Sequence, residues 1–207
     1  MKVYIVGEDA VSYVVIKKVL LYCSREIEII AELPARGGQI KQKISEFNKL
    51  SESYPVILLS DLDNNDCAPQ LLNKLFPKGK NEHFIFNIAI DEAEAWLMAD
   101  RDGFSKYFYV DIADIPFPIA QKQGGPKALI EMDFKYKSSM FLTHELIRKS
   151  KKKELLQQLM PKVGAVKGPE YNSVILPFIE NYWDISQARK NADSLNRMIC
   201  RIERLFN

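Results

Sequence analysis

Apolar and polar residues alternate with two different periods along the first hundred residues. Short apolar or partly alternating stretches predict β-strands at residues 3–6, 26–33, 56–59 and 83–90. Apolar residues at helical spacing predict helices over residues 10–23, 39–53 and 67–76, and residues 91–99 open another. Strands that alternate with helices form a mostly parallel sheet with right-handed crossovers and helices on both faces. We therefore predict an α/β fold with a Rossmann-like, four-stranded sheet.

The strand ends are where a site is expected. In such sheets ligands bind outside the carboxyl ends of the strands, near the point where the strand order reverses. If the first and third strands are neighbours, as in a 2-1-3-4 order, the residues that follow those two strands face each other.

The second half of the chain has a different pattern. Residues 111–127 are loop-like, because they contain Pro116, Pro118, Pro126 and a pair of glycines. A strongly basic stretch over residues 135–153 is typical of a solvated helix face, and its other interpretation is contact with phosphates. Asp193 and Ser194 cap a final helix with one apolar stripe. We predict two parts, an α/β domain over residues 1–110 and a mainly helical extension over residues 111–207 packed on it.

Acidic residues stand at the end of the third predicted strand. Asp61 and Asp63 directly follow the apolar run of residues 56–59, which is too short for a helix and right for a strand buried on both faces. Two carboxylates two residues apart point to the same side of an extended chain, where they repel unless a cation or a proton lies between them. This favours Mg²⁺ or Mn²⁺ bound by oxygen ligands. The alternative is a solvated turn, which Asn64 and Asn65 also suit.

Two other strand ends carry acidic residues as well. Glu8 follows the first strand, and Asp91, Glu92 and Glu94 follow the fourth. Acidic residues at three strand ends strengthen the prediction of a metal site formed by Glu8, Asp61, Asp63 and Glu92 or Glu94. If Glu92 begins a helix, the side chains of Glu92 and Glu94 diverge, so both cannot point into one site. Glu94 also suits the first turn of a helix without any functional role.

Composition and charge narrow the class of protein. The 207 residues are 47% hydrophobic and 27% charged, as in ordinary globular proteins. Three well-separated cysteines and two histidines argue against a disulfide framework, a zinc site and His-based catalysis. No apolar run is long enough to span a membrane, and an acidic residue comes too early for a signal peptide, so we expect a cytoplasmic protein.

Residues 1–100 carry 11 Lys and Arg against 15 Asp and Glu, and the remaining residues carry 18 against 12. This asymmetry fits an acidic metal site beside a phosphate-binding surface.

The acidic pattern resembles the Toprim domain of primases, topoisomerases, small ribosomal-RNA maturases and overcoming-lysogenization-defect nucleases. That family has a Glu after the first strand, matched by Glu8, and an Asp-x-Asp after the third, matched by Asp61 and Asp63. The resemblance implies that the Asp pair holds Mg²⁺ and that Glu8 binds metal or transfers a proton. The family often has a glycine shortly after the second Asp, where this chain has Asn64.

More of the chain resembles a small stand-alone group of Toprim-like bacterial proteins. The matching segments lie at residues 36–38, 61–63, 67–69, 92–100, 125–127, 168–172 and 194–197. Members commonly have an arginine before the Glu-x-Glu, where this chain has Asp91. Relatives occur in anti-phage defence, which implies that context and a partner protein of a defence system.

Phosphoryl transfer also needs positive charge near the developing negative charge. Arg36, Lys127 and Lys167 are the candidates, with Tyr171 beside them. Together these observations predict a Mg²⁺-dependent nuclease acting on DNA or RNA. The alternatives are a receiver-like signalling module, which also has acidic residues after its first and third strands, and a non-catalytic defence component that binds a partner.

Overall fold

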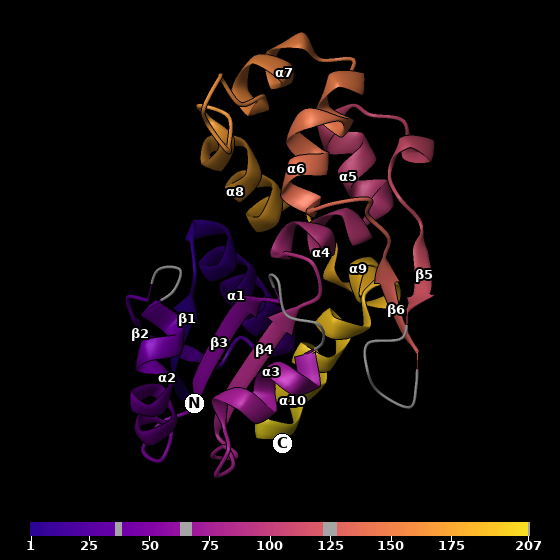
Figure 1. Cartoon of the computed structure of the whole chain (residues 1–207). Helices are drawn as coiled ribbons and strands as arrows, with labels where there is room; N and C mark the ends of the chain where they lie inside the picture. Colours follow the sequence, from indigo (N-terminus) through magenta and orange to yellow (C-terminus); the bar gives the residue numbers. More distant parts are fainter. Residues whose placement is uncertain (36–38, 63–67, 122–127, 207) are drawn as a thin grey trace.

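A four-stranded parallel sheet forms the base of the molecule. In this computed structural model, which describes residues 1–35, 39–62, 68–121 and 128–206, the strand order is β2-β1-β3-β4, so the first and third strands are neighbours, the condition on which the sequence analysis paired their ends (Figure 1). The strands are β1 (Lys2–Gly7), β2 (Glu28–Glu32), β3 (Val56–Asp61) and β4 (Phe84–Ala89). Each neighbouring pair is parallel.

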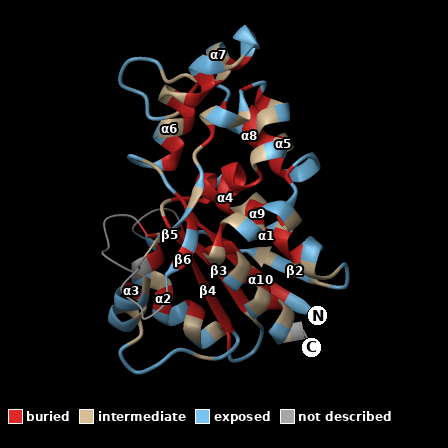
Figure 2. Cartoon of the chain, turned by 90° about the vertical axis from the view of Figure 1, so that its right-hand side faces the viewer, coloured by how far each residue is buried: buried red, intermediate tan, exposed pale blue. Residues whose placement is uncertain are grey.

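Alternate residues of the strands pack on opposite faces of the sheet. Ile57 and Leu59 of β3 belong to the larger apolar cluster, whereas Val56 and Leu58 belong to the smaller one. All four are fully buried, which confirms that β3 is covered on both faces. Buried residues are concentrated in β1, β3 and β4 and in the helix that follows β4 (Figure 2).

Helices cover both faces. α1 (Ala10–Cys23) and α10 (Asp193–Phe206) contribute to the larger cluster, and α2 (Gln39–Leu50) and α3 (Ala68–Leu75) to the smaller. α10 also contacts β4, because its apolar stripe, which includes the fully buried Leu195 and Ile202, faces the sheet. The last helix of the predicted extension therefore lies on the same face of the sheet as α1.

The rest of the chain is mainly helical, and much of it lies beyond the carboxyl edge of the sheet (Figure 1). Its elements are α4 (Ala93–Ala99), α5 (Arg101–Phe108), η1 (Ile112–Asp114), β5 (Pro118–Gln121), β6 (Leu129–Met132), α6 (Ser138–His144), η2 (Leu146–Lys149), α7 (Lys153–Leu159), α8 (Tyr171–Asn181) and α9 (Ile185–Asn191). None of the helices described combines the length and the apolar character needed to cross a bilayer.

An antiparallel hairpin, β5–β6, lies partly within the stretch predicted to be loop-like. Strands of four residues are too short to show a period in the sequence, and Pro118 is tolerated because β5 has a neighbour on one side only. The hairpin is fixed by tertiary contacts of β6, where Glu131 and Met132 are almost fully buried. The Glu131 carboxylate accepts hydrogen bonds from the backbone N–H and the hydroxyl of Ser194, at the start of α10.

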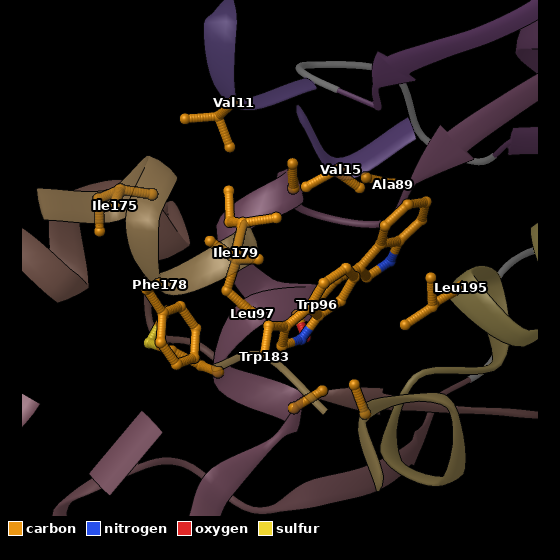
Figure 3. Packing of buried hydrophobic residues seen from close by; sticks show 14 of the residues in the cluster. Val11, Val15, Ala89, Trp96, Leu97, Ile175, Phe178, Ile179, Trp183 and Leu195 are labelled. Atoms are coloured by element: carbon orange, nitrogen blue, oxygen red, sulfur yellow. The ribbon is translucent and has the colours of Figure 1, made fainter. Parts of the chain in front are cut away.

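Trp96 connects these elements through a buried polar network. Its indole N–H donates to the Ser194 hydroxyl over 2.8 Å, and its carbonyl accepts from the Trp183 indole over 3.2 Å. Figure 3 shows Trp96 and Trp183 side by side among Leu97, Ala89 and Leu195. Side chains from the sheet, from α4 and from the C-terminal helices thus share one core.

We expect Trp96→Phe to lower the free energy of unfolding by about 1–3 kcal/mol, because it removes buried volume and the donor to Ser194. Urea unfolding measures the change. Tyr109→Phe is the matched control, since Tyr109 is 45% exposed and should change stability by less than about 0.5 kcal/mol. Equal stability of Trp96→Phe and the unsubstituted chain would show that the network contributes nothing.

Candidate functional site

Glu8 and Asp61 meet at the carboxyl edge of the sheet. β1 and β3 are parallel neighbours with Gly7 opposite Leu59, so the residues that follow these positions lie side by side. The Glu8 carboxylate accepts a hydrogen bond from the Ser60 hydroxyl over 2.5 Å and one from the Asp61 backbone N–H over 3.3 Å. The structure therefore brings together the two strand ends that the sequence analysis paired.

Asp9 joins this edge because α1 begins immediately above it. A Cβ atom at Gly7 would lie 2.9 Å from the Cβ of Ser12, so only glycine allows this close approach of strand and helix. Asp9 caps α1, accepting from the backbone N–H of Ser12 over 2.9 Å. A further carboxylate is thereby placed beside Glu8.

Asp61 lies among like charges. Its Oδ1 accepts from the backbone N–H of Ala93, at the start of α4. Burial, and then the charges of Glu94, Glu8, Glu92 and Asp9, raise the pKa of Asp61 to about 9. Without a cation the carboxyl group is therefore protonated at neutral pH, and a bound divalent cation would favour its ionised form.

Glu92 and Asp91 turn toward α6. Glu92 accepts from the backbone N–H of Ser139 over 2.8 Å and lies 3.4 Å from the Lys137 ammonium. Asp91, in the left-handed conformation with φ +75°, accepts from the backbone N–H of Ser138. Burial raises the pKa of Asp91 to about 7, although the Ser138 hydrogen bonds oppose this. This pair therefore tethers α6 to the end of β4.

Glu94 points the other way, toward α8. Its Oε1 accepts from the Tyr171 hydroxyl over 2.6 Å and lies 3.2 Å from the Lys167 ammonium. Lys167 also contacts Asp9, at 3.1 Å, and its ammonium lies 4.5 Å from the centre of the Tyr171 ring. Although burial opposes it, the charges of Glu94 and Asp9 raise the pKa of Lys167. Because α4 begins at Ala93, Glu92 and Glu94 diverge, as predicted for a helix that starts at Glu92.

The segment that carries Lys167 is packed tightly against α7. A Cβ at Gly168 would lie 2.3 Å from the backbone carbon of Leu159, so a larger residue would displace this segment. Lys167 therefore reaches the edge of the sheet from a closely packed backbone and links Asp9 to α4 and α8.

We call the carboxyl edge of the sheet at Glu8, Asp9 and Asp61 the acidic edge. Whether it fits a metal ion depends on the ligand atoms that it offers. Glu8 and Asp61 provide carboxylate oxygens, the ligands that Mg²⁺ and Mn²⁺ prefer. Asp63, Arg36 and Lys127 lie outside the described residues. Within the described ranges, no group of three or more His, Cys, Asp and Glu side chains could hold a metal ion. Glu92 and Glu94, as placed, bind α6 and Lys167 instead.

Two residues of this edge were not singled out from the sequence. Asp9 carries a recognisable signal, because an Asp three residues before Ser12 at a helix start is a typical cap. Ser60 carries none, since a serine before Asp61 is unremarkable until the parallel pairing places it against Glu8.

No protein-family profile matches the chain, and no curated protein or solved structure is significantly similar to it.

Proposed function

We propose that the protein is a Mg²⁺- or Mn²⁺-dependent nuclease of the Toprim type, hydrolysing phosphodiesters of DNA or RNA. The observation that carries the proposal is the position of Asp61, at the carboxyl edge of a parallel sheet, beside Glu8 and close enough to three further carboxylates for their charges to raise its pKa. A cluster of like charges at this edge is the arrangement that a divalent cation stabilises.

Asp61 and Glu8, with Asp63, would hold the cation, which supplies positive charge to a phosphodiester and lowers the pKa of a bound water. Glu8 would also be able to move a proton, because its carboxylate lies beside Asp61 at the same edge. Lys167 offers an ammonium group at the same edge. Glu94 holds that ammonium in place, so binding of a second cation by Glu94 would require this ion pair to break.

The resemblance to Toprim-like proteins extends the proposal to anti-phage defence in a bacterium, with a partner protein of that system. The acidic edge supports the nuclease chemistry, and the resemblance alone supports the biological context.

The experiment is cleavage of plasmid DNA and of total RNA, with Mg²⁺ or Mn²⁺ titrated against EDTA. We expect cleavage of one polymer that saturates with metal and stops on chelation, because Asp61 and Glu8 need a cation to act together. Cleavage that persists in EDTA would contradict the mechanism. Labelling of Asp61 by acetyl phosphate, without cleavage, would favour the receiver-like alternative.

A further inference from the structure

Three open cavities follow one another across the surface. The first, of about 650 Å³, borders the acidic edge and is lined by Glu8 and Asp9, by Tyr13 and Lys17 of α1, and by Asn172 of α8. The second, of about 550 Å³, is lined by Lys18, Leu21, Tyr22 and Arg25 and by residues 182–185. The third, of about 840 Å³, lies against α5, α7 and α9 and shares Tyr182 and Asp184 with the second.

The geometry of α1 and α8 joins these cavities into one groove. The residues of α1 that line the first cavity, at positions 10, 13, 14 and 17, adjoin those that line the second, at positions 18, 21 and 22, because residues four apart are neighbours one turn along the helix. α8 runs beside α1 in the same direction, since Asn172 lines the first cavity and the carbonyl of Glu180 accepts from the Lys18 ammonium. We call the sequence of three cavities from Glu8 to the α5–α7 side the α1–α5 groove.

Tyrosine rings line the groove without being part of the core. Tyr182 is 61% exposed and packs against Tyr107, with ring centres 4.9 Å apart. Tyr109 occupies the left-handed conformation, with φ +54°, at the C-terminal end of α5. Its ring is 45% exposed and lines the third cavity.

Basic side chains accompany the rings. The Lys152 ammonium lies 4.1 Å from the centre of the Tyr109 ring. Within the described part of the chain, Lys106 forms no salt bridge and no side-chain hydrogen bond, so its ammonium is available to a ligand. With Lys18 and Arg25, the second and third cavities carry four cations against Asp102 and Asp184, whereas the first cavity carries Lys17 against Glu8, Asp9 and Glu32. Asp100 also lines the third cavity, but it is 1% exposed, and burial raises its pKa.

We propose that the α1–α5 groove binds single-stranded nucleic acid. Exposed aromatic faces with interleaved Lys and Arg are what unpaired bases and a phosphate backbone require, and a duplex does not offer its base faces for stacking. The open, extended shape suits a polymer better than a single small ligand. One end of the groove is at Glu8, so a nucleic-acid strand bound along the groove would lead to the acidic edge. This part of the inference rests on the proposed nuclease function.

The test is fluorescence anisotropy with a labelled single-stranded oligonucleotide of about 20 residues and with its duplex, in EDTA so that no cleavage occurs. We expect the single strand to bind more tightly than the duplex. Tyr182→Ala and Lys106→Ala together should weaken that binding by at least about tenfold, because loss of one stacked base costs about 1–3 kcal/mol. The affinity should also fall as salt rises, since phosphate contacts release counterions.

Matched controls separate the groove from the general surface. Tyr54→Ala removes a tyrosine that is 45% exposed outside the groove, and Lys78→Ala removes an exposed lysine, so both should bind as the unsubstituted chain does. Unchanged affinity of the groove variant would overturn the proposal, as would equal affinity for the duplex. Binding of ATP without binding of the oligonucleotide would overturn it in favour of a small nucleoside phosphate.

The two proposals can fail separately. If no cleavage is found but the groove variant loses single-strand binding, the groove stands and the nuclease function falls. If cleavage depends on metal but the groove variant binds normally, the nuclease function stands and the groove falls.

Discussion

Asp61→Asn should reduce metal-dependent cleavage by more than about a hundredfold, since even the loss of an outer-shell partner of a metal ligand costs about 10–100-fold. The same substitution should stabilise the chain in EDTA. Asn keeps the carbonyl oxygen that accepts from the backbone N–H of Ala93, but it removes a carboxyl group whose charge is opposed by burial and by its acidic neighbours. We expect a gain of about 1–2 kcal/mol, or about 2–8 °C in Tm.

Asp61→Asn should lower the cleavage rate and raise the stability. These opposite effects distinguish a buried charge that serves function from a residue that only supports the fold. Asp133→Asn is the matched control, because Asp133 is exposed and lines neither the acidic edge nor the α1–α5 groove, so it should change neither cleavage nor Tm. Thermal unfolding in EDTA and initial cleavage rates in Mg²⁺ give the two readings. If Asp61→Asn cleaves at the unsubstituted rate, Asp61 does not serve the reaction. A lower Tm in EDTA would show that the Asp61 charge is not destabilising.

Stability in EDTA should fall as pH rises. A carboxyl group with a higher pKa in the folded chain than in the unfolded chain keeps its proton longer in the native state, so stability declines between the two values. For Asp61 this interval runs from 3.8 to about 9, and burial also raises the pKa values of Asp91 and Glu131 to about 7. Each group contributes at most about 1.4 kcal/mol per pH unit within its interval. Urea midpoints at about pH 5, 7 and 9 measure the slope.

A divalent cation should reverse the part of this decline that belongs to Asp61. Bound metal favours the ionised carboxylate, so Mg²⁺ or Mn²⁺ should stabilise the chain most at high pH, by about 2.7 kcal/mol at a concentration one hundred times the Kd. Asp61→Asn should remove this stabilisation and flatten the slope, leaving the contributions of Asp91 and Glu131. An equal effect of the cation on Asp61→Asn and on the unsubstituted chain would place its binding elsewhere.

The hydrophobic pattern determined the sheet and its order of elements. β3 is an uninterrupted apolar run, and α1 shows clear helical spacing, so both follow from period alone and both lie where predicted. The approach of Glu8 to Asp61 follows from the sequence once β1 and β3 are neighbours, because parallel neighbours bring the same ends together. The strand order that makes them neighbours comes from the structure.

The directions of the acidic side chains were decided by tertiary structure. The sequence shows that Glu92 and Glu94 diverge on a helix, but not that one meets the start of α6 and the other meets Lys167. Lys167 lies 158 residues from its partner Asp9, a distance along the chain over which no local pattern acts. The β5–β6 hairpin and the exposed ring of Tyr109 have the same origin, since each is held by residues remote in sequence. Period and propensity determine which segments form and in what order, whereas side-chain partners depend on which surfaces meet when those segments pack.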